Sequence, residues 1–293
     1  MGSRFVGSQA VVRRALICQM GHGVSVSISR KWLVMSICLL LLSLSLGITT
    51  QAMANDKGPL IAAAANVKLV LDKIIADYHN DTGANVRVSY GSSGNFVAQI
   101  QQGAPYELIL SADEFYVNKL AALGLIQGQG RIYAIGRLAL VAPHHSPMSL
   151  DADLHGLKQL LATGGLTHFA IANPKHAPYG ERAVEVLTAS GNWPQIKHKL
   201  ILGENVSQAL QFALSGSTQG GIVALSLAQH AEFKEHGRYI ALPETWHQPL
   251  KQRMALIKHA SIQAKDFYEY LLLPSTQQTF TEFGFAAAVT GDN

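Results

Sequence analysis

The stretch VRVSYGSSGN, residues 86–95, places two serines between two glycines at the end of a run that alternates apolar and polar residues. Alternation with a period of two is typical of a half-buried β-strand. The residues that follow, FVAQIQQG, have the apolar spacing and the terminal glycine of a short helix. The serines therefore lie where a predicted strand is followed by a predicted helix. Two roles are open for them: Ser92 or Ser93 caps the helix with its side chain, or the N–H groups and hydroxyls of this turn hold an anion.

The same order of strand, short loop and helix recurs along the chain. LIAAAAN precedes VKLVLDKIIADYHNDTG, whose apolar residues mark one helical face before Gly83 ends it. The order returns in HFAIANPKHAPYG with ERAVEVLTASG, and again in HKLILGENVSQALQFALSG. Near the C-terminus, SIQAKDFYEYLLLPSTQQTFTEFGF predicts two helices broken at Pro274. This alternation predicts an α/β architecture with largely parallel strands and right-handed crossovers.

Residues 1–54 have the features of a signal peptide with an N-terminal extension. They contain five basic and no acidic residues, and the apolar run WLVMSICLLLLSLSLGI is followed by small residues that end at Ala54. This order is typical of a secretory leader, so we expect the mature chain to begin at Asn55 and to be exported to the periplasm. A retained membrane anchor is the alternative, although the apolar run is marginal for spanning a bilayer. Met20 is an alternative start of translation.

Removal of the leader changes the charge of the chain. The whole sequence has 23 basic and 19 acidic residues, whereas residues 55–293 have 18 and 19. The pI of about 9.0 therefore belongs largely to the leader, and the near-neutral mature chain gives no support to nucleic-acid binding. Cys18 and Cys38 also lie in the leader, which excludes disulfides, thiol catalysis and cysteine metal sites from the mature chain.

The mature chain of 239 residues exceeds one average domain, and we expect it to form two lobes. The first lobe is predicted to comprise residues 55–141 and 249–293, and the second residues 142–248. This arrangement requires two chain crossings, near residues 138–143 and 249–258, which would serve as a hinge. Because ligands of such sheets bind beyond the carboxyl ends of the strands, a crevice between the lobes is the expected site.

Four helix starts carry hydrogen-bond donors that we expect to converge in this crevice. Each follows a predicted strand, and each presents unpaired N–H groups and a positive dipole end. The candidate donors are the Asn66 amide, the Ser93 hydroxyl, the Tyr179 phenol and the Val206 backbone N–H. None of these groups is ionised. Such a site suits a fully deprotonated oxyanion, because a protonated phosphate would also need a hydrogen-bond acceptor.

Five motifs, in order along nearly the whole mature chain, resemble the periplasmic molybdate-binding proteins of ABC transporters. They are AAAAN at residues 62–66, YGSSGNFVAQIQQGAPYELILSAD at 90–113, ANPKHAPYG at 172–180, GENV at 203–206 and FTEFGF at 280–285. The resemblance implies a type II two-lobed periplasmic binding-protein fold, with mixed sheets, helices on both faces and a hinge crevice. It also implies capture of molybdate or tungstate through hydrogen bonds to the oxygens, without direct metal ligation or a cofactor. Delivery to a membrane permease with its ATPase would follow.

By position in these motifs, the resemblance implies that Asn66, Ser93, Tyr179 and Val206 contact the oxyanion. Asn66 stands where many members of the family have serine, and Ala224 where many have a tyrosine that binds the anion. We expect the phenol of Tyr179 to supply the missing hydroxyl. The resemblance implies a monomeric binding protein and not an enzyme. A carrier of another oxyanion such as sulfate is the closest alternative, because donors alone do not define the size of a cavity.

Two other classes of function are weaker alternatives. An enzyme would use Ser93 as a nucleophile with a histidine as its base, but the chain lacks a GxSxG elbow and no histidine lies in the serine motif. A cation site would use scattered histidines with Asp or Glu, and their spacings match no familiar metal motif. These histidines are His144, His145, His155, His168 and His176.

Overall fold

The computed structural model describes residues 57–288. The predicted signal peptide of residues 1–54, its cleavage site and the start at Asn55 lie outside these residues. These residues belong to one compact unit. Within residues 57–288, no helix has both the length and the apolar character needed to cross a membrane.

The first sheet contains strands from both ends of the described chain. Its members are β1 (Leu60–Ala64), β2 (Arg87–Gly91), β3 (Leu108–Leu110), β4 (Arg131–Gly136) and β10 (Leu250–Leu256), in the spatial order β2-β1-β3-β10-β4. Strand β1 pairs in parallel with β2 and β3, whereas β10 pairs antiparallel with β3 and β4. The sheet is therefore mixed, with β10 as its reversed member.

The second sheet is built from the middle of the chain in the same manner. Its members are β5 (Leu138–Pro143), β6 (Phe169–Ala172), β7 (Leu200–Gly203), β8 (Gly221–Ala224) and β9 (Gly237–Ala241), in the order β7-β6-β8-β5-β9. Strand β6 pairs in parallel with β7 and β8, whereas β5 pairs antiparallel with β8 and β9. We call the first sheet with its helices the first lobe and the second sheet with its helices the second lobe.

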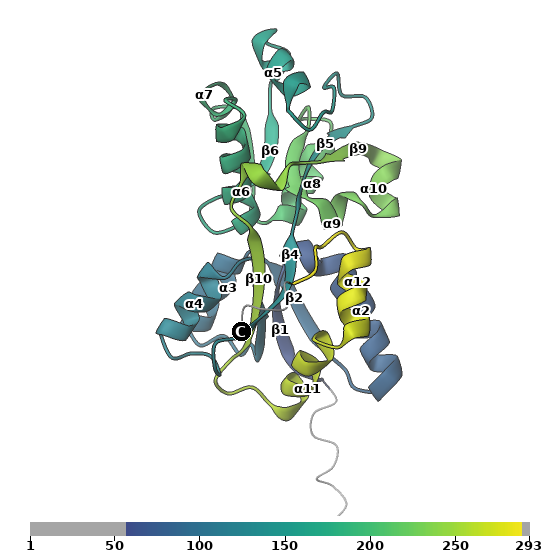
Figure 1. Ribbon diagram of the computed structural model, residues 1–293. Coiled ribbons are helices and arrows are strands. Elements are labelled where there is room, and N and C mark those ends of the chain that lie inside the picture. Colours follow the sequence, from purple (N-terminus) through teal and green to yellow (C-terminus); the bar gives the residue numbers. More distant parts are fainter. Residues whose placement is uncertain (1–56, 289–293) are drawn as a thin grey trace, which may run out of the picture. The chain divides into compact units, whose positions relative to one another are not determined.

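Helices cover both faces of the first sheet (Figure 1). They are η1 (Ala65–Val67), α2 (Lys68–Thr82), α3 (Ser93–Gln101), α4 (Phe115–Ala122), α11 (Ile262–Leu271) and α12 (Pro274–Glu282). Because alternate residues of a strand point to opposite faces, Ile61 and Ala63 pack in one core with α2, α11 and α12. Ala62 packs on the other face, in a core with α3 and α4.

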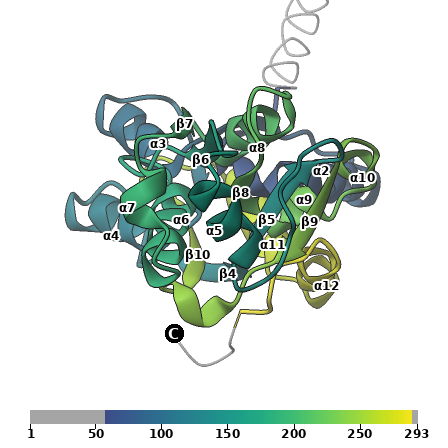
Figure 2. The same cartoon turned by 90° about the horizontal axis from the view of Figure 1, so that it is seen from above.

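Helices also flank the second sheet. They are α5 (His155–Ala162), α6 (Pro178–Ala189), α7 (Trp193–Ile196), α8 (Val206–Leu214), α9 (Leu225–Ala228), α10 (Ala231–His236) and η2 (Glu244–Trp246). Both α6 and α8 contact β6 and β8, and Figure 2, which looks down on this lobe, shows them on opposite sides of these strands. Strand β6 leads into α6 and β7 leads into α8, and both helices pack back against the sheet.

The chain passes between the sheets twice. The first passage is the single residue Arg137, between the ends of β4 and β5. The predicted first boundary, after residue 141, thus falls inside β5, all of whose paired residues belong to the second sheet. The second passage joins β9 to β10, and the predicted boundary before residue 249 falls within it. The sheet changes at Arg137 because the buried run of β5 pairs with β8 from its first residue onward.

Two helix ends predicted from sequence are confirmed. Helix α2 ends at Gly83, which adopts a left-handed conformation with φ 71°, a geometry that glycine adopts without steric cost. The last two helices are separated before Pro274, which occupies the first turn of α12, where its missing N–H costs nothing. A local glycine or proline residue therefore determines each of these two helix ends.

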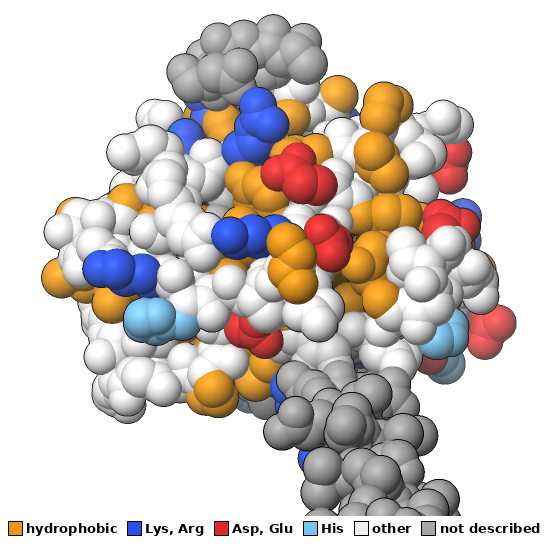
Figure 3. All heavy atoms as spheres, turned by 90° about the horizontal axis from the view of Figure 1, so that it is seen from below, with side chains coloured by type: hydrophobic (Ala, Val, Ile, Leu, Met, Phe, Trp, Pro, Cys, Tyr) orange, Lys and Arg blue, Asp and Glu red, His pale blue; other side chains and the backbone are white. Residues whose placement is uncertain are grey.

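The face shown in Figure 3, seen from below the first lobe, mixes the two signs of charge with hydrophobic side chains. On α2, Lys68 and Lys73 each form an exposed ion pair with the aspartate four residues further on. A face with interspersed charges has no single-sign field for a nucleic acid backbone.

Candidate functional site

The four residues predicted as oxyanion ligands lie around one cavity. Asn66 is in η1 directly after β1, Ser93 is the first residue of α3, Tyr179 the second of α6 and Val206 the first of α8. All four line the same cavity and each is at most 4% exposed. The structure therefore brings together two residues from each lobe. Their role as ligands stays a prediction.

The lining of this cavity carries no charged side chain. It consists of Ala64, Ala65, Asn66, Gly91, Ser92, Ser93, Ala112, Ala177, Pro178, Tyr179, Asn205 and Val206. The cavity volume open to the centre of a water-sized sphere is only about 10 Å³, which is enough for about one water molecule. Such a cavity has no room for a sugar or an amino acid. Ala224 is not part of the lining.

Three helices begin at the cavity wall. Ser93, Tyr179 and Val206 all belong to a first helical turn, where backbone N–H groups have no intrahelical acceptor. Each helix start also contributes a partial positive charge. In α6 the N–H of Pro178 is absent, so Tyr179 provides the first N–H of that helix. These features make the cavity a site for a group that only accepts hydrogen bonds.

The two serines of the YGSSG motif do not cap α3. Ser92 occupies the N-cap position, but its side chain makes no capping hydrogen bond. Its hydroxyl instead lies 2.9 Å from Nδ1 of His176 in the second lobe. The Ser93 hydroxyl accepts a hydrogen bond from the backbone N–H of Ala112 at 3.0 Å. With that acceptor position used, the remaining proton of Ser93 is available to a ligand in the cavity.

Helix α8 is capped by the residue beside the cavity. The Asn205 side chain accepts hydrogen bonds from the backbone N–H groups of Ser207 at 3.0 Å and Gln208 at 3.1 Å. Asparagine at an N-cap position typically accepts these two hydrogen bonds. The N–H of Val206 lies between the cap and these two satisfied groups, so it is the donor that α8 leaves for the cavity.

Hydrogen bonds join the lobes around the cavity. The Gly94 N–H donates to the carbonyl oxygen of His176 at 2.9 Å. From the second lobe, the hydroxyl of Ser207 donates to the Ala65 carbonyl at 3.1 Å and that of Ser226 to the Asn66 carbonyl at 2.9 Å. These bonds join the lobes at or next to lining residues, so the lobes are closed on each other.

Two further side chains join the lobes at the edge of the cavity. Asn95 of α3 donates to the carboxylate of Glu204, and Glu204 also lies 3.6 Å from Nε2 of His176. The sequence did not predict that Asn95 and Glu204 form a contact between the lobes. Both lie next to motif residues, but nothing in their local pattern indicates that they face each other.

The phenol of Tyr179 is directed toward the strands behind the cavity. Its hydroxyl accepts a hydrogen bond from Gln252 Nε2 at 3.1 Å, and a Cβ atom on Gly136 would lie 2.5 Å from both groups. Neither Gly136 nor Gln252 lines the cavity. Burial raises the pKa of the phenol well above its usual value, and hydrogen bonds from Gln252 and Asn66 offset part of that rise. The phenol is therefore neutral, and it is held by β10.

Gln252 is a residue of this site that sequence reasoning missed. It is fully buried on β10, on the same strand face as the apolar Leu250 and Met254, because residues two apart share a face. A signal was present in the sequence LKQRMAL: a polar amide interrupts the buried alternation of a strand. Buried amides require partners, so such an interruption indicates a polar network.

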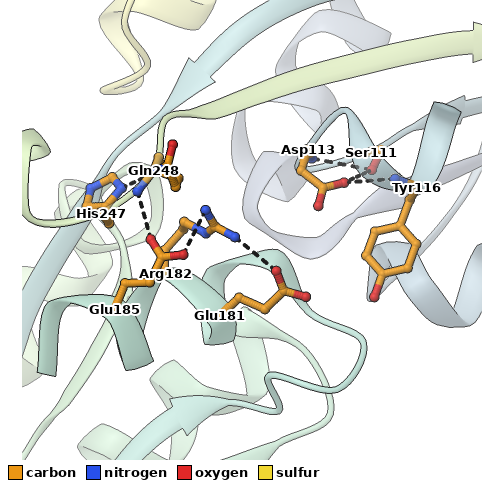
Figure 4. Close-up of polar contacts among 8 residues, drawn as sticks. All are labelled: Ser111, Asp113, Tyr116, Glu181, Arg182, Glu185, His247 and Gln248. Carbon is orange, nitrogen blue, oxygen red and sulfur yellow. Dashed lines mark hydrogen bonds and ion pairs between the residues drawn. The ribbon is translucent and has the colours of Figure 1, made fainter. Parts of the chain in front are cut away.

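Charged residues of the two lobes interact near elements that carry lining residues (Figure 4). Burial raises the pKa of Asp113, next to the lining residue Ala112, to about 6. The Tyr116 N–H and the Ser111 hydroxyl donate to its carboxylate at 3.3 and 3.2 Å, which lowers the pKa in part. On α6 of the second lobe, Arg182 forms two ion pairs, one with Glu181 and one with Glu185, each at 3.0 Å.

Other features of residues 57–288 fit an anion less well. A larger hollow of about 260 Å³ is lined by residues of α2, α11 and α12 that include Asp77 and Asp81, and carboxylates repel anions. Among the described residues, no three His, Cys, Asp or Glu side chains come together in a way that could hold a metal ion. The small cavity between the lobes is therefore the candidate site.

Known proteins resemble this chain over almost all of its described length. The family of bacterial extracellular solute-binding proteins matches residues 59–286. A molybdate-binding protein ModA from Rhodobacter capsulatus is 34% identical over 247 residues, which are 83% of this chain and 93% of that protein. The ModA protein of Azotobacter vinelandii is 32% identical over 255 residues, which are 86% and 99% of the two chains.

A solved structure supports the same relationship. The periplasmic molybdate-binding protein of Azotobacter vinelandii has a TM-score of 0.71 to this structure at 28% identity, covering 78% of this chain and 99% of that one. The α/β fold with two lobes and mixed sheets that the sequence predicts is therefore confirmed.

The raised pKa of Asp113 predicts a pH dependence of stability. An unfolded aspartate titrates near about pH 3.9, whereas folded Asp113 titrates near 6. Between these values the folded protein holds a proton that the unfolded chain has lost, so the stability contribution of Asp113 falls as the pH rises and is constant above the folded pKa. Asp113→Asn removes this titration. The melting temperature of the variant relative to wild type should therefore rise between about pH 4 and pH 6 and then level off.

Thermal unfolding without added oxyanion at a series of pH values measures this difference. The matched control is Asp153→Asn, at an exposed position. A difference between Asp113→Asn and wild type that stays constant across the whole pH range would contradict the prediction.

Proposed function

The chain belongs to the bacterial extracellular solute-binding protein family, and we propose that it captures molybdate or tungstate in the periplasm and delivers it to an ABC transporter. The observation that carries the proposal is the convergence of uncharged donors from two helix starts in each lobe on one small cavity without a charged side chain. The names of the relatives support molybdate as the ligand. Family membership confirms the prediction of a binding protein and not an enzyme.

We propose four hydrogen-bond donors to the anion. The hydroxyl of Ser93 and the side-chain amide of Asn66 come from the first lobe, and the backbone N–H groups of Tyr179 and Val206 from the second. The sequence predicts the phenol of Tyr179 as the donor. We propose its N–H instead, because the hydroxyl lies beside Gly136 and Gln252, neither of which lines the cavity. Each donor would bind an oxygen of the anion, so no protein atom needs to ligate the metal.

Neutral donors favour a dianion that carries no proton. Inside a closed cavity the effective dielectric is low, and hydrogen bonds there are strong when satisfied and costly when unmatched. Molybdate presents only acceptors. Hydrogen phosphate also presents an O–H that requires an acceptor, and leaving it unpaired costs about 1–3 kcal/mol. The proposed site thus selects by protonation state as well as by size.

Cellular context forms part of the proposal. Export by the predicted signal peptide of residues 1–54, the periplasmic location, the permease and ATPase partners and the monomeric state are all proposed from the sequence and from the family. The lobes are proposed to move about the two passages between the sheets, at Arg137 and between β9 and β10.

The first prediction of the proposed function concerns the ligand. Thermal unfolding with molybdate, tungstate, sulfate, phosphate and chromate should show the largest stabilisation with molybdate or tungstate, because a ligand stabilises the folded state by its affinity and concentration. Calorimetry should then show one molybdate per chain. Phosphate that competes with molybdate on equal terms would contradict the proposed function, and a preference for sulfate would identify a sulfate carrier.

The second prediction concerns Ser93. Ser93→Ala removes one donor to the anion and should weaken molybdate binding by about 1–3 kcal/mol, or roughly 5- to 150-fold. The variant also leaves the buried N–H of Ala112 without its acceptor, so the stability without ligand should fall modestly. Calorimetry and thermal unfolding measure the two effects separately.

A matched control distinguishes binding from stability. Ser146→Ala removes a serine of the second lobe that donates to the Gln219 carbonyl at 2.6 Å and accepts from the Met148 N–H. It should lower the stability without ligand and leave the molybdate affinity within about twofold. An unchanged affinity in Ser93→Ala as well would show that Ser93 is not a ligand.

The third prediction concerns closure. Without an anion, the helix starts that meet at the cavity lose their common acceptor, so we expect the lobes to separate about the two passages. Small-angle scattering should show a smaller radius of gyration on saturation with molybdate, and no change with phosphate. Identical scattering curves with and without molybdate would show that binding does not close the lobes.

A further inference from the structure

A buried polar network centred on Gln252 lies behind the cavity. The Asn66 Nδ2 donates to Gln252 Oε1 at 3.0 Å, and the Tyr133 hydroxyl donates to the same oxygen at 2.8 Å. On the other side of the amide, Gln252 Nε2 donates to the Tyr179 hydroxyl. Gln252 and Tyr133 are fully buried and Asn66 is 1% exposed. Every polar atom of this network therefore depends on a partner within the protein.

With the amides in these orientations the network is not satisfied. Asn66 Oδ1 is buried and has no hydrogen-bond partner within residues 57–288. The single proton of the Tyr133 hydroxyl faces two acceptors, because the Ser111 carbonyl oxygen lies 3.1 Å from it as well. A buried acceptor without a partner costs about 1–3 kcal/mol. In a cavity that holds an anion, it would also repel the ligand.

Half a turn of both amide groups removes the conflict at Tyr133 and replaces the unpaired acceptor of Asn66 by an unpaired donor. The turn exchanges O and N within each amide without moving other atoms. Gln252 Nε2 then donates to Asn66 Oδ1 and to the Tyr133 hydroxyl. Tyr133 is free to donate its proton to the Ser111 carbonyl, and Gln252 Oε1 accepts the proton of Tyr179. The Asn66 Nδ2 group, with both of its N–H bonds, is then left for the cavity that Asn66 lines.

We propose that Gln252 sets the specificity of the cavity by holding the Asn66 amide so that it donates into the cavity and cannot accept there. The inference rests on the proposed function, because it concerns the same site. Gln252 does not itself line the cavity, so it is a positioning residue that acts through Asn66. The substrate class that follows is an oxyanion without a proton, since only such an anion matches donors on every side.

The position of the network explains why it can act before ligand binds. Asn66, Tyr133 and Gln252 all belong to the first lobe, so the Asn66 amide is oriented without the second lobe. Tyr179 comes from α6 of the second lobe and joins only when the lobes meet. Gly136 makes room for that contact, because a Cβ there would lie 2.5 Å from both Gln252 Nε2 and the Tyr179 hydroxyl.

The amide orientation can be measured directly in the wild-type protein. In nuclear magnetic resonance spectra of the isotope-labelled protein without ligand, both side-chain N–H protons of Gln252 should exchange slowly with heavy water, because both are bonded inside the first lobe. Those of Asn66 should exchange fast and should shift when molybdate is added. Slow exchange of an Asn66 proton together with fast exchange of one Gln252 proton would overturn the proposed orientation.

A double-mutant cycle tests whether Gln252 acts through Asn66. Gln252→Leu keeps similar volume and removes the amide, so the Asn66 side chain is no longer held. We expect molybdate binding to weaken roughly 10- to 100-fold in the wild-type background and at most about threefold in the Asn66→Ala background. The ratio of molybdate to phosphate affinity should fall in Gln252→Leu, because a freed Asn66 can turn its oxygen to the cavity.

The control is Gln127→Leu in the same lobe. Gln127 donates to the carbonyl oxygens of Ile257 and Lys258, away from the cavity, and its loss should leave affinity and selectivity within about twofold. Equal losses from Gln252→Leu in both backgrounds, or a parallel loss of molybdate and phosphate binding, would overturn the inference and leave the proposed function standing. A wild-type protein that binds no molybdate would overturn the proposed function, and the exchange measurement would still decide the orientation of the amides.

Discussion

Unpaired N–H groups at the starts of helices are the constraint on which the site depends. Helices α3, α6 and α8 each follow a strand, and their first turns contain N–H groups without an intrahelical acceptor. An anion supplies acceptors for donors from both lobes at once, which no single side chain of the lining could do. The lining is built from small residues such as Ala65, Ala112 and Ala177, so the backbone itself can reach the ligand.

Residues behind the lining, and not charged residues within it, control the electrostatics of the site. Because no lining residue carries a charge, selectivity depends on whether each polar group donates or accepts, and the network around Gln252 decides this for Asn66. Charged side chains lie outside the lining, and on α6 Arg182 pairs with two glutamates. Burial raises the pKa of Asp113, which is next to the lining residue Ala112.

The connection of the lobes suits a site that is completed from two sides. Strands β5 and β10 enter their sheets directly from the passages between the lobes, and each is the reversed member of its sheet. The passage at Arg137 is a single residue, so it limits how far the lobes can slide and favours rotation. Interlobe hydrogen bonds such as that between Gly94 and His176 lie on the cavity side, where rotation would break and re-form them.

The sequence by itself determined the alternation of strands and helices, the helix ends at Gly83 and Pro274, and the positions of four donors at helix starts. These features rest on periodicity and on turn chemistry within about ten residues, so they can be read locally. The motifs also determined the family. Only the tertiary structure decided that the donors meet in one cavity, that Ser92 and Ser93 have partners other than the helix they begin, and that the sheet changes at Arg137. It alone placed the Tyr179 hydroxyl against Gln252, and Gln252 against Asn66, 186 residues away in sequence. Contacts of that range arise from the packing of whole layers, whose energy is a sum of many small terms that no local pattern records.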